Sequence, residues 1–167
     1  MNRRIYIVLL ITLLLTFKMD LFGQSTGKIL KVLSKEMNVS KSDIELDEVE
    51  ADAALTEKIG AVYSYQLKGE KQGYVIVANG MGRYDEFSFF LLTDLDKSTQ
   101  MVRVVKYISD HGGEITSKKW LNQFQGYKGG TLKYGDDIQA ISGATLSASS
   151  ITNRIHEIID LLNSSDL

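Results

Sequence analysis

The sequence predicts an α+β fold, an antiparallel β-sheet packed with helices, and three observations lead to this prediction. Apolar and β-branched residues form four strand-like segments, at 61–67, 73–80, 86–95 and 99–108. Short polar or glycine-containing turns separate these segments, and strands joined by such turns pair in antiparallel fashion. The last segment, 148–163, has instead the apolar spacing of an amphipathic helix that faces a core. Strands and helices in separate runs of the chain are typical of the α+β class.

Shorter elements are expected before the four strands. A helix is expected at 26–37, opened by Ser25 or Thr26 as a cap, and a short strand near Ile44. A turn or helix is expected around 51–59. None of these elements has the repetition of a repeat protein, and no linker interrupts the chain.

Two helical segments are expected to cover the sheet. The sequence KKWLNQFQG predicts a short helix with Trp120, Leu121 and Phe124 on one face. The final helix follows the SGAT sequence at 142–145 and has apolar residues at the positions that face a core. These positions are Ile151, Ile155, Ile158, Ile159 and Leu162.

Composition excludes several classes of function. The chain has 167 residues, of which 44% are hydrophobic and 24% charged, as in a globular domain with one core. The net charge is −2 and no basic stripe is present, so nucleic acid is not an expected partner. There is no cysteine, which excludes disulfides, thiolate metal sites and a cysteine nucleophile. His111 has no partner at a ligand-like spacing, so no metal site is expected.

The N-terminal segment predicts an exported chain. Arg3 and Arg4 precede an apolar run at 5–17, which is shorter than the roughly 20 residues of a membrane span. Such a run is typical of a secretory signal peptide, and Gly23 and Ser25 are small residues at the spacing of a cleavage site.

An uncleaved anchor is the alternative for the same segment. In both cases the basic start stays in the cytoplasm and the rest of the chain faces outward. Residues 1–25 are therefore expected to be a signal peptide or N-terminal membrane anchor, and 26–167 a single domain.

Small residues stand directly before the final helix, in the stretch ISGATLSASSIT. Ser142, Gly143 and Ala144 leave the backbone accessible ahead of Thr145, and Ser147 is expected to cap the helix. The unpaired amides of a first turn and the helix dipole attract an anion. Thr145 is therefore expected to present its hydroxyl on an open turn beside a phosphate-binding position.

The threonine hydroxyl is not expected to react unaided. A threonine alcohol is a poor nucleophile without a base, and no histidine or acid stands beside Thr145 at the spacing of a catalytic triad. No catalytic residue is therefore expected in the chain, and modification by another enzyme would avoid the difficulty.

The same stretch closely resembles the flavinylation motif of FMN-binding domains. These domains occur in the covalent-FMN subunits of the sodium-translocating NADH:quinone reductase and of the Rnf electron-transport complex. The resemblance implies that a dedicated flavin transferase attaches FMN, through its phosphate, to Thr145. It implies cofactor-binding roles for the neighbouring motif residues, which are Ser142, Gly143, Ala144 and Ser147.

An upstream segment, YISDHGGEITSKKWLNQFQG, also resembles the family. The resemblance implies that Gly112, Gly113 and Glu114 lie near the flavin, and it extends over roughly 73–162. Tyr127 and Tyr134, on glycine-rich loops, are the candidates for stacking on the flavin ring.

One position departs from the family motif. The family usually has an aspartate three residues before the serine, where this chain has Gln139; the nearest acids are Asp136 and Asp137. The upstream turn also reads GGEIT in place of the commoner Thr-Pro-Gly form. Non-covalent FMN is therefore the alternative to attachment at Thr145.

The resemblance implies an exported flavoprotein that transfers electrons to or from membrane redox proteins. It implies such an electron-transfer protein or subunit in preference to an enzyme that acts alone. Its partners would be the flavin transferase and those redox proteins. Two other functions stay open. One is a module that binds or senses FMN or another phosphate ligand reversibly, and the other is a structural domain without a ligand.

Overall fold

The computed structural model describes residues 26–50, 59–165 and 167, in two compact units, Met1–Lys41 and Ser42–Leu167. In the first unit a helix covers residues 26–37, as the sequence predicts. The predicted signal segment, 1–25, lies outside the described residues. So does nearly all of the turn or helix expected at 51–59. In the part of the chain that is described, no helix has both the length and the hydrophobicity of a membrane span.

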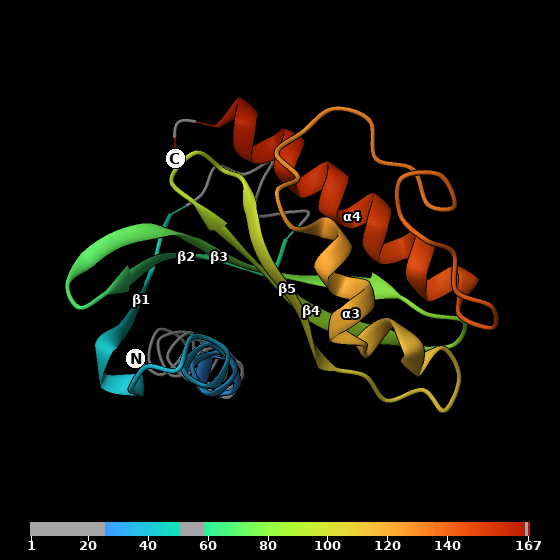
Figure 1. The fold of residues 1–167 in the computed structure, drawn as a ribbon, viewed down its shortest axis with the longest axis horizontal. Coiled ribbons are helices and arrows are strands. Elements are labelled where there is room, and N and C mark those ends of the chain that lie inside the picture. Colours follow the sequence, from blue (N-terminus) through green and yellow to red (C-terminus); the bar gives the residue numbers. More distant parts are fainter. Residues whose placement is uncertain (1–25, 51–58, 166) are drawn as a thin grey trace, which may run out of the picture. The chain divides into compact units, whose positions relative to one another are not determined.

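The second unit contains a five-stranded antiparallel sheet in the order β1-β2-β3-β4-β5, so that each strand pairs with its neighbours in sequence (Figure 1). This arrangement confirms the predicted α+β class, and the four predicted strands and the short strand near Ile44 are all present. The strands are β1 Ile44–Glu48, β2 Ala61–Leu67, β3 Glu70–Met81, β4 Glu86–Asp94 and β5 Thr99–Lys106.

A tight turn and register shifts within the strands set the pairing of this sheet. Lys68 and Gly69 both have positive φ, 54° and 81°, between the paired residues Leu67 and Glu70. This is the geometry of a type I′ hairpin, whose twist matches that of antiparallel strands. A bulge between Tyr65 and Gln66 then shifts this register by one residue. The resulting pairing places Val62, Ile76, Leu91 and Val102 in one row across the sheet.

That row belongs to a core that the helices complete. The short helices are η1 Lys41–Asp43, η2 Gly113–Thr116, α3 Lys118–Leu121 and η3 Asn122–Phe124, and the long helix is α4 Thr145–Ser164. Helix α4 contacts β3, while α3 and η3 contact β5 (Figure 1). Trp120, Leu121 and Phe124 are buried as predicted, and so are all five apolar positions predicted for the final helix. Full burial of each such side chain stabilises the fold by about 1.5–3 kcal/mol.

The start of α4 differs from the prediction. The helix begins at Thr145, three residues before the expected start at residue 148, and Ala144 is the N-cap residue. The Ala148 amide donates to the Ala144 carbonyl at 2.8 Å, so the helical hydrogen bonds already begin there. Ser147 therefore lies within the first turn, and its predicted role as the cap is wrong.

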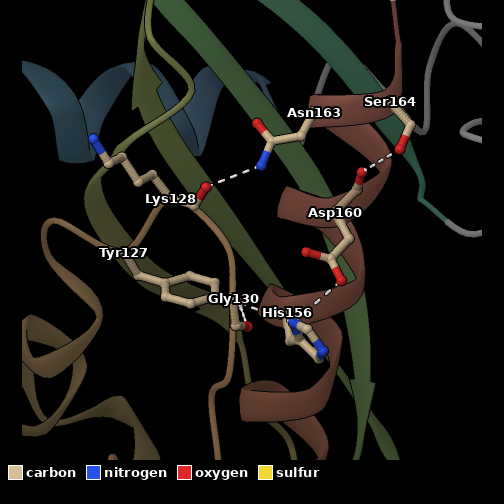
Figure 2. A network of polar contacts seen from close by, with 7 residues as sticks. All are labelled: Tyr127, Lys128, Gly130, His156, Asp160, Asn163 and Ser164. Atoms are coloured by element: carbon tan, nitrogen blue, oxygen red, sulfur yellow. Dashed lines mark hydrogen bonds and ion pairs between the residues drawn. The ribbon is translucent and has the colours of Figure 1, made fainter.

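Polar contacts hold the C-terminal half of α4 against the loop that follows η3 (Figure 2). Tyr127 donates its hydroxyl proton to the Gly130 carbonyl at 2.8 Å, and its oxygen lies 2.8 Å from His156 Nδ1. The histidine nitrogen is therefore the donor in the second bond. The Asn163 amide donates to the Lys128 carbonyl at 2.9 Å. These bonds hold α4 in place along the sheet, which positions its opposite end.

Candidate functional site

A pocket of about 290 Å³ lies at the N-terminal end of α4. Three segments that are distant in sequence form its walls: the β3–β4 hairpin, the turn before η2 and the start of α4. The lining residues are Arg83, Tyr84, His111, Gly112, Gly143, Ala144, Thr145, Leu146 and Ser147. The structure thus brings the SGAT sequence and the HGG turn together in one concavity.

A turn delivers the chain to the start of α4. The Ala144 amide donates to the Ile141 carbonyl at 3.3 Å, and Gly143 has a φ of 82°. A positive φ at the third residue of a hydrogen-bonded turn is typical of type II and favours glycine. A side chain at Gly143 would meet nothing within 4 Å, so this side of the turn is open space. Thr145, the next residue but one, is exposed.

The first turn of α4 is suited to an anion. No side chain caps it, and it contains no acidic residue. The first backbone amides of a helix have no partner within the helix, and together with the helix dipole they favour negative charge. Because Thr145 is the first residue of α4, its hydroxyl lies beside these amides.

Ser147 fixes the first turn of α4 to the loop that follows β5. Its side chain is 3% exposed, and its oxygen lies 3.2 Å from the Tyr107 hydroxyl oxygen. Tyr107 donates its own proton to the His111 carbonyl in a short hydrogen bond, so the serine hydroxyl is the donor to the tyrosine. This chain of two hydrogen bonds joins α4 to the turn that contains Gly112.

Two glycines allow the three walls to approach one another at this point. A Cβ atom at Gly82 would lie 3.2 Å from the Ser147 hydroxyl oxygen. A Cβ atom at Gly112 would lie 2.7 Å from the Tyr107 hydroxyl and 3.7 Å from the Cα atom of Ala144. Gly112 also has a φ of 81°, a conformation that side chains disfavour. The close approach of Gly112 to α4 therefore depends on glycine.

The loop before the SGAT sequence is held by its backbone. The Ile141 amide donates to the Tyr134 hydroxyl at 2.8 Å. At Gln139, the amide donates to the Gln123 side chain at 2.8 Å, and the carbonyl accepts the Trp120 indole proton at 2.7 Å. The Gln139 residue is nevertheless exposed. The position that departs from the family motif is thus fixed in space while its side chain faces solvent.

No family model and no curated protein matches the sequence. Among solved structures, one similar chain is NqrC of the Na⁺-translocating NADH-quinone reductase from Parabacteroides distasonis. The TM-score is 0.54 at 18% identity, over 78% of this chain and 81% of that chain. This chain has the NqrC fold. NqrC from Shewanella oneidensis aligns with a TM-score of 0.47 at 16% identity, over 71% of this chain and 70% of that one.

Within this NqrC fold, the residues singled out in the sequence lie in different places. Gly112 lines the pocket together with the four residues Gly143, Ala144, Thr145 and Ser147. Ser142, Gly113 and Glu114 are exposed and are not part of the lining. Ser142 and Gly113 each follow or precede a lining residue directly, whereas Glu114 is two residues from Gly112.

The two tyrosines suggested for stacking do not line the pocket. Tyr127 bonds to His156 in the middle of α4, and Tyr134 supports the Ile141 amide. The stacking interpretation of both residues therefore has no support in the structure. The pocket contains another aromatic residue, Tyr84.

Four lining residues were not selected from the sequence: Arg83, Tyr84, His111 and Leu146. Arg83 and Tyr84 stand between Gly82 and the acidic start of β4. In the sequence, this place indicates only that the two residues form an exposed hairpin tip. Leu146 interrupts the run of small residues around Thr145 with a large apolar side chain that is 57% exposed. No group of three or more metal-ligating side chains is found among the described residues.

Proposed function

We propose that this protein is an electron-transfer flavoprotein that holds FMN at the start of α4, with its phosphate on Thr145. The proposal rests on one observation: the exposed Thr145 hydroxyl opens onto a pocket shared by the SGAT and HGG segments, beside an uncapped helix N-terminus. The resemblance of ISGATLSASSIT to the flavinylation motif and the NqrC fold support the same function. When bound, FMN would supply reversible one- and two-electron chemistry.

The residues at the site fit a flavin phosphate. The first-turn amides of α4 offer donors and positive potential. Gly143 leaves open space on its side of the turn, which would admit bulky phosphate oxygens. Ala144 is buried and small, and Gly112 lines the same pocket without a side chain. The pocket volume, about 290 Å³, is at the lower end of the range for ligand sites.

Attachment requires an activated flavin phosphate and a second protein. The Thr145 oxygen would attack phosphorus, forming a phosphoester, while a phosphoanhydride bond of the flavin donor breaks. The leaving phosphate would take the bonding electron pair, and the hydroxyl proton would pass to a base. Because a threonine alcohol needs such a base to react, we propose that a separate flavin transferase supplies it.

An exported location would give covalent attachment a physical reason. A flavin bound only by reversible contacts would be lost outside the cytoplasm, whereas a phosphoester keeps it on the chain. We propose that the protein acts outside the cytoplasm, exported by the segment at residues 1–25. Its partners would be membrane redox proteins that donate or accept electrons.

Mass spectrometry tests this function. The full chain is coexpressed with a flavin transferase, and the intact mass is compared with that of Thr145→Ala. We expect the wild type to gain one FMN less one water, and the variant to gain nothing while unfolding at the same urea concentration. Thr131→Ala is the matched control and should still be modified, because Thr131 is an exposed threonine that does not line the pocket. A wild type without added mass and without flavin absorbance after denaturation would disprove attachment.

A second candidate is a module that binds FMN or another phosphate ligand reversibly. Gln139 favours it, because its exposed side chain stands where the family has a carboxylate that a transferase could recognise. In that case the wild type stays unmodified and Gln139→Asp becomes modified. Equal modification of both proteins would remove the support for this candidate.

A further inference from the structure

We propose that the β3–β4 hairpin and the first turn of α4 together form the contact surface for the flavin ring. Tyr84 and Leu146 would contact the faces of the isoalloxazine, and Arg83 would lie beside it. This inference rests on the proposed function, since it names the residues that would hold the ring once the phosphate is on Thr145.

Two large apolar side chains are exposed in one pocket. Tyr84 is 69% exposed and Leu146 is 57% exposed, and both line the pocket from separate elements. A single exposed apolar side chain is ordinary on a protein surface. Two that line one concavity, directly beside the threonine, provide apolar area that a planar ring would remove from water.

The tip of the β3–β4 hairpin is held in place. The Gly82 amide donates to the Asp85 carbonyl at 2.9 Å, which closes the turn. The Met81 amide donates to the Ser150 hydroxyl on α4 at 2.8 Å. The hairpin is therefore tied to the same helix whose first turn bears Thr145. This link fixes the backbone of Tyr84 relative to that of Leu146.

The pocket lining also contains a positive charge. Arg83 is the one permanently charged residue among those that line the pocket; His111 is the other basic residue there. The Arg83 guanidinium lies 5.5 Å from the centre of the Tyr84 ring, within the range of a cation–π contact. A flavin ring gains negative charge on reduction, and a nearby guanidinium stabilises the reduced form. Arg83 is thus a positioning and tuning residue for the ring.

The test compares flavinylated wild type with three pocket variants, one aromatic replacement and two controls outside the pocket. Tyr84→Leu removes the aromatic contact, Arg83→Gln removes the charge, and Leu146→Ala removes the second apolar contact. Tyr84→Trp should restore an aromatic contact. Leu95→Ala is the matched control for Leu146, because Leu95 is 55% exposed but follows the opposite end of β4.

Two readouts other than activity are measured: flavin fluorescence and midpoint potential. Tyrosine and tryptophan quench flavin fluorescence on contact, so Tyr84→Leu should be several-fold brighter and Tyr84→Trp dim again. Leu146→Ala should be brighter than Leu95→Ala, which should equal the wild type. Arg154→Gln is the control for the loss of one positive charge, because Arg154 does not line the pocket. Arg83→Gln should have a lower midpoint potential than both the wild type and Arg154→Gln. Fluorescence and potential unchanged in all pocket variants would overturn the inference.

A second measurement separates this inference from the proposed function. Unmodified protein is titrated with riboflavin, which has the ring but no phosphate. We expect Tyr84→Leu to weaken this binding by about two- to tenfold, the value of a lost aromatic contact. If the wild type takes no covalent flavin, the proposed function fails and riboflavin alone decides the ring contacts. The proposed ring contacts are then overturned if the wild type does not bind riboflavin, or if Tyr84→Leu binds it as tightly as the wild type does.

Discussion

The hydroxyl oxygens of Ser147 and Tyr107 lie 3.2 Å apart and join the first turn of α4 to the loop after β5. This bond gives Ser147 a tertiary role in place of capping. It also helps to bring Thr145 and Gly112 into the lining of one pocket, since Tyr107 in turn bonds to the His111 carbonyl.

Replacement of these two hydroxyls is expected to show coupling. Ser147→Ala should lower the free energy of unfolding by about 1 kcal/mol, and Tyr107→Phe, which loses two bonds, by about 1–2 kcal/mol. The free energy of unfolding that the double variant loses should be smaller than the sum of the two single losses, by about 0.5 kcal/mol or more. Urea unfolding of the four proteins provides the values. Strict additivity would show that the bond contributes nothing.

Gly112 and Gly113 offer a matched pair. Gly112→Ala places a Cβ atom 2.7 Å from the Tyr107 hydroxyl and strains a φ of 81°. The free energy of unfolding should fall by about 1–2 kcal/mol from the strained backbone conformation alone. Gly113→Ala meets nothing within 4 Å and should stay within about 0.5 kcal/mol of the wild type. Thermal unfolding of both variants checks the difference, and equal midpoints would contradict the tight approach of Gly112 to α4.

Lys97 caps the opposite end of α4. Its ammonium donates to the Leu162 carbonyl at 2.5 Å and to the Ser165 carbonyl at 3.0 Å. Lys97→Met should lower the free energy of unfolding by about 1–2 kcal/mol, because it removes charged hydrogen bonds at the negative end of the helix dipole.

Lys68→Met is the control for that change. Lys68 also stands in a hairpin turn with positive φ, but its side chain is exposed. Urea unfolding should show a change within about 0.5 kcal/mol for this variant. An equal loss in both variants would mean that the loss comes from turn conformation and not from the helix cap.

Tyr127 should make stability fall at alkaline pH. Burial, followed by the nearby Asp160 and Asp137, raises the pKa of the Tyr127 hydroxyl. The folded state therefore disfavours the ionised phenol. The stability that depends on the neutral phenol is complete below the unfolded pKa of about 10, and is lost as pH rises through the folded pKa.

Urea unfolding between about pH 8 and pH 11 tests this expectation around the unfolded pKa. Tyr127→Phe should be less stable than the wild type near neutrality, since it loses two hydrogen bonds, but should lose less stability on going to high pH. Tyr65, whose pKa is also raised by burial, should account for a separate part of the fall. A variant that falls as steeply as the wild type would contradict the role of Tyr127.

Local pattern was sufficient for most of the fold. Runs of apolar and β-branched residues between short turns predicted the four strands from β2 to β5, and the spacing of Ile151, Ile155 and Leu162 predicted the buried face of α4. The start of α4 was missed by three residues, because Ser147 looks like a cap in sequence. The turn that ends at Ala144 instead begins the helix earlier.

The sequence by itself determined that small residues precede the Thr145 hydroxyl and that a core-facing helix follows it closely, because these features depend only on neighbouring residues. Only the tertiary structure decided what faces that threonine. The β3–β4 turn brings Arg83 and Tyr84 to the pocket, and the bond between Tyr107 and Ser147 brings Gly112. Such contacts depend on strand register and on the packing of α4 against β3, which no local pattern specifies.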